Sequence, residues 1–123
     1  MKITRFEDIE GWQMARENAK AVYTVSKHEL FSRDWGLKDQ IRRAAGSVMH
    51  NIAEGFDSGS NAEFVKFLRY AQRSCREVQS QLYLALDQEY LDQALFDELY
   101  AANNAAHAKI GGFIKYLKGS GHP

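Results

Sequence analysis

SNAEFVKFLRYAQRSCREVQSQLYLALDQ, residues 60–88, carries apolar side chains every three or four positions without a break. This spacing places them on one face of an α-helix. The stripe comprises Phe64, Phe67, Leu68, Ala71, Cys75, Val78, Leu82 and Ala85. A helix over about 60–88 is roughly 40 Å long, and its start matches a capping box in which Ser60 and Glu63 bond each other's backbone N–H groups. A long helix with one apolar face predicts a helical bundle.

The same periodicity predicts three more helices, over about residues 8–27, 34–54 and 92–118. Gly55 is predicted to cap the second helix at its C-terminus, and Asp92 is predicted to cap the fourth at its N-terminus. The segment KHELFSRDWG, residues 27–36, breaks the first helix. Four helices joined by short connections, with no strand pattern, predict an all-α fold. We expect one domain over residues 1–123, an antiparallel up-down-up-down four-helix bundle.

Composition narrows the class of protein. A chain of 123 residues with 45% hydrophobic content fits one compact core. Sixteen basic and sixteen acidic side chains cancel, so attraction to nucleic acid has to come from local clusters of charge. The single cysteine, Cys75, excludes an internal disulfide, and no apolar run approaches the roughly 20 residues that span a bilayer. We expect a cytoplasmic protein with no membrane contact.

One cluster of basic residues lies on the longest helix. We name it the basic ridge, and it consists of Lys66, Arg69, Arg73 and Arg76. These residues span about 80° of arc opposite the apolar stripe, and the ridge is about 15 Å long. It matches a phosphate backbone, which predicts binding of RNA or DNA with help from Arg42. A solvated face, or pairing with acids of another subunit, explains it equally well.

The second helix carries two further patterns beside its core line. A polar band flanks the core and should be half buried, with Arg43 paired to Glu54 or Glu77. The band and its predicted partners on the third helix are Gln40, Arg43, Ser47, Asn51, Glu54, Ser74 and Glu77. It fixes helix register, or it forms a ligand site or a subunit contact. Apolar and small residues off the core lines predict a homo-oligomer interface, comprising Gly46, Met49, Ala53, Phe56, Tyr83 and Leu84.

Catalytic and metal-binding patterns are poor. No Glu-x-x-His occurs, and His50 with Glu54 alone falls short of a metal site. Cys75 falls on a core line, and no glycine-rich phosphate loop precedes a helix. We therefore expect a non-enzyme with no catalytic residue, no metal and no cofactor.

The segments DQIRRAAGSVMHNIAEGF, residues 39–56, and SNAEFVKFLRYAQRSCREVQSQL, residues 60–82, resemble the signature of a bacterial four-helix bundle family. That family is named for the 23S rRNA intervening-sequence protein, and the resemblance runs from FEDIEGWQMA to YLKG, residues 6–119. It implies an antiparallel four-helix protomer, with relatives that assemble into homopentameric barrels, so we expect a homo-oligomer, a pentamer by this resemblance. A related branch, the accessory variability determinant of diversity-generating retroelements, is a basic barrel that binds nucleic acid and partners a reverse transcriptase.

By position, the family's polar signature falls on Gln40, Arg43, Ser47, Asn51, Glu54, Gly55, Ser74 and Glu77. The chain departs from many relatives at Asp57, where they carry a basic residue, and its neutral charge departs from the basic branch.

Three hypotheses for the function follow from the sequence. In the first, a ring-forming, non-enzymatic bundle binds RNA or DNA through the basic ridge. In the second, the protein is a scaffold or adaptor for a protein partner, which its neutral net charge favours. In the third, Arg43, Asn51 and Glu54 orient a small anion in an enzyme pocket, which requires a cavity.

Overall fold

The computed structural model of the chain describes residues 2–120, and within that range its regular structure is entirely helical. A 3-10 helix, η1 (Phe6–Asp8), precedes five α-helices. They are α1 (Glu10–Val25), α2 (Glu29–Arg33), α3 (Trp35–Phe56), α4 (Asn61–Asp87) and α5 (Gln93–Ser120). The all-α prediction is confirmed; residues 1 and 121–123 of the predicted domain lie outside the described residues.

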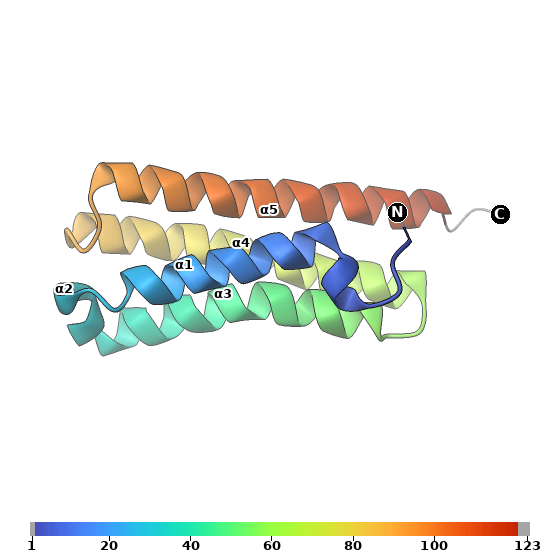
Figure 1. Cartoon of the computed structure of the whole chain (residues 1–123), viewed down its shortest axis with the longest axis horizontal. Helices are drawn as coiled ribbons and strands as arrows, with labels where there is room; N and C mark the ends of the chain where they lie inside the picture. The colour runs from blue at the N-terminus through green and yellow to red at the C-terminus, as the bar shows by residue number, and fades with distance from the viewer. Residues whose placement is uncertain (1, 121–123) are drawn as a thin grey trace.

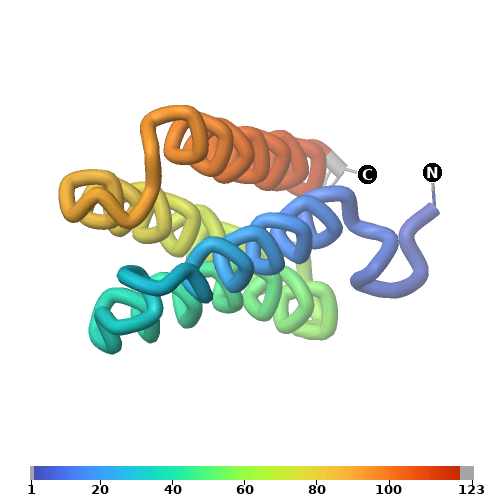
Figure 2. The backbone as a smooth tube through the Cα atoms, turned by 60° about the vertical axis from the view of Figure 1, so that its left-hand side comes forward, coloured from blue at the N-terminus to red at the C-terminus, as the bar shows by residue number. Residues whose placement is uncertain are grey.

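The four long helices lie side by side along one axis. Figure 1 shows α1 and α4 leading away from the end where the chain enters, and α3 and α5 leading back to it. Each long helix packs against two neighbours, α3 against α1 and α4, and α5 against α4 and α1 (Figures 1 and 2). This arrangement leaves every helix with an outer face. No helix within residues 2–120 is long and apolar enough to cross a membrane.

Side-chain caps start three of these helices. Ser60 Oγ accepts a bond from the Glu63 backbone N–H at 3.2 Å, which is one half of the predicted capping box. The Asp92 carboxylate accepts from Leu95 N at 2.8 Å, as predicted for the fourth helix. The Asp34 carboxylate accepts from Leu37 N at 3.1 Å and also from the Tyr90 hydroxyl at 3.0 Å. These bonds satisfy backbone donors that have no partner inside the helix.

The predicted apolar stripes form the interior in two clusters. The cluster near α2 includes Val22, Ile41 and Leu82, each with no exposed surface. The cluster at the other end includes Ile52 and Leu68, which are also fully buried. Met49 is partly buried and packs against both clusters, so it lies where they meet.

Residues 29–33 form the short helix α2, where the sequence predicted only a break. Phe31 is its buried residue, with 0% of its surface exposed, and its ring stacks on Tyr90 at 5.2 Å. A helix of five residues is too short to show periodicity, so its apolar signal is a single side chain. It closes one end of the bundle.

Gly55 is not a helix cap, which corrects the prediction. It lies inside α3, one residue before the last, and Asp57 follows the helix. A Cβ atom at Gly55 would lie 2.8 Å from Phe64 Cδ1 and 2.9 Å from Phe67 Cβ. Glycine is therefore required for the close approach of α3 and α4, and the left-handed turn falls instead at Gly59, with φ of +95°.

Candidate nucleic-acid interface

The basic ridge lies on the outer side of α4, and its four residues are exposed. Three of them, Arg69, Arg73 and Arg76, line a pocket of about 270 Å³ together with Gln72 and His107. Because His107 belongs to α5, the pocket opens at the seam between α4 and α5. Lys66 lies on the same helix but does not line the pocket. The ridge is therefore a local arginine cluster with a lysine beyond it.

Hydrogen bonds within α4 and across the seam to α5 hold Arg76. Its Nη1 donates to Gln79 Oε1 at 2.7 Å and to Asn104 Oδ1 at 3.0 Å. Its Nη2 lies 3.5 Å from Nδ1 of His107. Gln79 is itself buried, and its Nε2 donates to the Tyr100 carbonyl oxygen at 3.3 Å. The guanidinium group is thus anchored by two amide oxygens instead of by a carboxylate.

Two more contacts order the wall of the pocket. Gln72 Nε2 donates to the His107 carbonyl oxygen at 3.2 Å. Arg73 lies over the ring of Tyr70, with its Cζ 5.4 Å from the ring centroid. Both contacts restrain these side chains before a ligand arrives. Less side-chain conformational entropy is therefore lost when a ligand binds.

The charged side chains that line the pocket are all arginines. The ion pairs within residues 2–120 join Arg5 to Glu7, Arg33 to Glu29, Arg43 to Asp39 and Lys109 to Glu10, so none of them involves the basic ridge. No carboxylate lines the pocket. Burial, and then the positive charge of Arg76, lower the pKa of His107 below its usual value. The pocket therefore offers unneutralised cations to an anion.

Arg42 does not join this surface. Its Nε donates to Ser26 Oγ at 2.8 Å, and its Cζ lies 4.5 Å from the ring centroid of Tyr23. Both partners belong to the end of α1 or the turn after it, so Arg42 braces α1 against α3. The help that the sequence predicted from Arg42 is not supported by this position.

The polar band is only partly assembled. Ser47 is its centre, because Ser74 Oγ lies 3.0 Å from Ser47 Oγ, and Asn51 Nδ2 donates to the Ser47 carbonyl and hydroxyl oxygens at 2.9 and 3.0 Å. The predicted ion pair of Arg43 with Glu54 or Glu77 is wrong, since Arg43 pairs with Asp39 at 2.9 Å. The reason is helix geometry, which brings residues four apart together.

The predicted half-burial of the whole band is also wrong. Three of its members on α3 are exposed, namely Gln40, Arg43 and Glu54, and the predicted partner Glu77 on α4 is exposed as well. Part of the band lines a second pocket of about 550 Å³ on the outer face of α3, where it meets Tyr23 of α1. That pocket is lined by Tyr23, Asp39, Arg42, Arg43, Gly46, Ser47, His50, Asn51 and Glu54. Its mixed charges favour no single ligand.

The predicted subunit-contact residues divide into two groups. Met49, Ala53 and Phe56 are partly buried and pack against the core clusters of the protomer, so they do not form an outer apolar strip. Tyr83 and Leu84 are 51% and 52% exposed. The sixth residue, Gly46, lines the pocket on α3. Tyr83 and Leu84 are therefore the members of the predicted interface with substantial free apolar surface.

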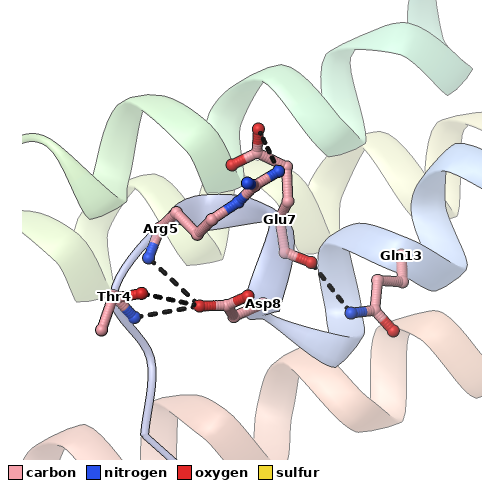
Figure 3. Close-up of polar contacts among 5 residues, drawn as sticks. All are labelled: Thr4, Arg5, Glu7, Asp8 and Gln13. Atoms are coloured by element: carbon pink, nitrogen blue, oxygen red, sulfur yellow. Dashed lines mark hydrogen bonds and ion pairs between the residues drawn. The ribbon is translucent and has the colours of Figure 1, made fainter.

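A third pocket, missed by the sequence reasoning, lies between the start of α1 and the last turns of α5. It measures about 700 Å³, and small residues such as Gly11, Ala108 and Gly112 line it beside Phe113. The segment before α1 closes it and is drawn in Figure 3. Small residues recurring on two helices are the sequence signal that points to such a gap.

Polar contacts fold that segment back on itself. The Asp8 carboxylate accepts from the Thr4 N–H at 3.0 Å, and this bond leads the causes that lower its pKa (Figure 3). Arg5 pairs with Glu7 at 3.0 Å, and Gln13 donates to the Glu7 carbonyl oxygen at 2.8 Å. These contacts fix η1 at the start of α1.

Metal and nucleophile chemistry finds no support in the part of the chain that the structure describes. No three His, Cys, Asp or Glu side chains within residues 2–120 cluster for a metal ion. Cys75 is buried in the core, and burial raises the pKa of its thiol to about 11. A thiol in that state is a poor nucleophile at neutral pH.

The residues that sequence reasoning missed at the α4–α5 pocket are Gln72, Gln79, Asn104 and His107. The sequence signal for these residues is weak. It consists only of polar side chains in helices that are otherwise rich in alanine and leucine. Only the pairing of α4 with α5 brings them together.

Fold and site define the class as an all-helical bundle with a cationic pocket on its surface. The chain belongs to the 23S rRNA-intervening sequence protein family, whose model matches residues 7–112. A similar solved structure is that of a protein with unknown function from the S23 ribosomal protein family of Bacteroides thetaiotaomicron. The two chains are 21% identical with a TM-score of 0.78, over 85% of this chain and 98% of that one, so the likeness concerns the fold alone. Among curated proteins no match was found.

Proposed function

We propose that the protein is a non-enzymatic, cytoplasmic bundle that binds RNA or DNA through the basic ridge. The observation that carries the proposal is the convergence of Arg69, Arg73 and Arg76 on one pocket that no carboxylate lines. Surface arginines in a chain with equal numbers of acids and bases have many chances to pair, yet these three form no ion pair within residues 2–120. Phosphate groups are the common biological anions that guanidinium groups recognise best.

The test is binding of a generic duplex RNA and a generic duplex DNA at several salt concentrations. If each protomer neutralises about three phosphates, the logarithm of the binding constant should fall with the logarithm of salt with a slope of about −3. Arg69→Glu with Arg73→Glu should abolish the salt-sensitive part and leave the helix content unchanged, because both side chains are exposed. Arg33→Glu is the matched control, since Arg33 is an exposed arginine on α2.

Two results of that test contradict the proposal. One is binding that does not depend on salt, since it would not involve phosphates. The other is absence of binding at low salt, where surface charges act most strongly.

The second part of the proposal concerns assembly. We propose that the antiparallel, up-down-up-down bundle is the protomer of a ring-shaped homo-oligomer, a pentamer by the family resemblance. The half-exposed Tyr83 and Leu84 support a contact on the outer side of α4. Repeating a weak phosphate site around a ring raises its effective affinity for a long strand. Sedimentation should find a closed assembly larger than a dimer, and a monomer at micromolar concentration would refute this part.

A scaffold or adaptor for a protein partner is the second candidate. One observation favours it, which is that Trp35 and Leu30 are 74% and 57% exposed where α2 meets α3. Large exposed apolar side chains are typical of protein contacts. If this function is the right one, Trp35→Ala abolishes capture of one stoichiometric partner from nuclease-treated lysate. If the same partner is still captured by Trp35→Ala, this candidate is wrong.

A further inference from the structure

We propose that the α4–α5 pocket is a site for the terminal phosphate of a nucleic-acid strand, a phosphomonoester dianion, in preference to the diester phosphates inside the strand. This inference rests on the proposed function and adds the class of phosphate that the site selects. The geometry that points to it is a single pocket of about 270 Å³ that three arginines and one histidine line together.

The number of donors is the first argument. A diester phosphate carries one negative charge and exposes two free oxygens, whereas a terminal phosphate carries close to two charges at pH 7 and exposes three oxygens. Arg69, Arg73 and Arg76 each present several N–H groups in a rigid plane. A pocket so rich in donors is better matched by the terminal group.

The second argument concerns the N–H donors of the Arg76 guanidinium group that remain available to a ligand. A guanidinium group has five N–H donors. Both hydrogens of Nη1 are used by Gln79 Oε1 and Asn104 Oδ1, and one of Nη2 points to Nδ1 of His107. The Nε hydrogen and the second Nη2 hydrogen remain for a ligand. The contacts with α5 therefore fix Arg76 with a pair of donors still available.

His107 supplies the third argument, because it can respond to the charge of the ligand. Where its Nδ1 accepts from Arg76, its proton sits on Nε2 and the ring is neutral. The charged groups that line the pocket with it are Arg69, Arg73 and Arg76 of α4, and no carboxylate is among its lining residues. Burial and Arg76 lower the pKa of the imidazole in the free protein. A bound dianion offsets most of the positive charge of the three arginines and so favours the protonated ring. Nδ1 then no longer accepts from Arg76, whose Nη1 is still held by Gln79 and Asn104.

The first experiment compares three single strands of one sequence and length, ending in a 5′-phosphate, a 3′-phosphate or hydroxyl groups only. We expect the strands with either terminal phosphate to bind about tenfold more tightly than the hydroxyl-ended strand, as one added charge-assisted contact predicts. Comparison of the 5′ and 3′ arms identifies the end that the pocket takes. Arg76→Gln and His107→Gln should remove the preference, while Arg33→Gln should keep it.

The second experiment follows the His107 imidazole by NMR over a pH titration, with and without adenosine 5′-monophosphate. We expect the nucleotide to raise the pKa of His107, and Arg76→Gln to weaken that shift. The variants are checked by circular dichroism, since both positions lie at the surface seam and should leave the bundle folded.

The outcomes separate the two proposals. Equal, salt-dependent affinity for all three strands overturns the terminal-phosphate inference and leaves nucleic-acid binding intact. If no strand binds but the nucleotide still raises the pKa of His107, the proposed function fails and the pocket remains a phosphomonoester site. An unchanged pKa in the presence of the nucleotide overturns the inference.

Discussion

Replacing Gly55 by alanine should destabilise the bundle, although the same change stabilises most helices. In an exposed helix interior, alanine is more favourable than glycine by about 1 kcal/mol. At Gly55 the added Cβ meets Phe64 Cδ1 at 2.8 Å and Phe67 Cβ at 2.9 Å, both closer than carbon atoms pack. One of the two contacts is the root of a side chain, which cannot move away without its helix.

The expected magnitude follows from these two opposing effects. Overpacking of this kind costs about 1–3 kcal/mol or more. Phe64 cannot swing aside freely, because its ring packs edge-to-face against Phe113 at 5.4 Å and against Phe56 at 6.2 Å. The cost should therefore lie in the upper part of this range, about 2–3 kcal/mol, and the gain from alanine offsets about 1 kcal/mol of it. We expect Gly55→Ala to lower the free energy of unfolding by about 1–2 kcal/mol, or the melting temperature by about 4–8 °C for a chain of this size.

Gly112→Ala is the matched control, since it also lies inside a long helix and its Cβ would meet nothing within 4 Å. It should raise the free energy of unfolding by up to about 1 kcal/mol. Urea unfolding followed by circular dichroism measures both, at several protein concentrations because subunit association would add to stability. A Gly55→Ala variant as stable as Gly112→Ala would refute the close-approach argument.

A double-mutant cycle with Phe64→Leu isolates the clash. Leucine is smaller at the point of contact, so Phe64→Leu should cost less in the Gly55→Ala background than in the native one. Additive effects would show that the two positions do not interact.

Three further predictions concern assembly, the thiol and pH. Leu84→Lys should preserve the fold, because Leu84 is 52% exposed. It should also reduce the mass of the assembly measured by sedimentation, and an unchanged mass would show that Leu84 is not part of the subunit contact. Cys75, whose thiol pKa is raised to about 11 by burial, should react with a thiol reagent at pH 8 only as fast as the bundle opens, and rapid labelling of the native protein would contradict that. The pKa of His107 in the folded protein lies below its ordinary value of 6.5, so the unfolded chain binds this proton first as the pH falls. The free energy of unfolding should therefore decrease as the pH drops through about 6.5, and it should level off below the folded-state pKa. His107→Gln should flatten that part of the pH profile, and an identical profile would exclude this contribution.

The helices could be predicted from the sequence because their signals are local and repeated. The stripe from Phe64 to Ala85 recurs over many turns, so a single misread residue does not alter the prediction. Ser60 and Asp92 cap helices through backbone groups three residues away, which sequence spacing alone specifies. The arc of the basic ridge follows from the same helical geometry.

The role of Gly55 could not be predicted, because a glycine before a loop fits a cap and a close helix contact equally well. The choice depends on the placement of Phe64 and Phe67 on the neighbouring helix, which no local pattern gives. His107 is a similar case. It reaches Arg76, 31 positions away in the chain, through the axial alignment of α4 and α5. Arg42 and Arg43 are adjacent in sequence, yet about 100° of helix rotation sends one to α1 and leaves the other exposed.

Satisfied and unsatisfied polar groups distinguish structural sites from binding sites in this bundle. Ser47, Asn51 and Ser74 bond to one another or to backbone oxygens across α3 and α4, so their polar groups are already used within the protomer. Such a network fixes helix register and has little left to offer a ligand. Arg76 of the α4–α5 pocket is in the opposite state, because its positive charge meets two amide oxygens and an imidazole, and no carboxylate lines the pocket. A cation held in place without a counter-charge gains more from a phosphate than a paired cation does, since no ion pair has to be broken first. For this reason we propose that binding belongs to α4 and α5, and that the Ser47 network of α3 aligns the helices.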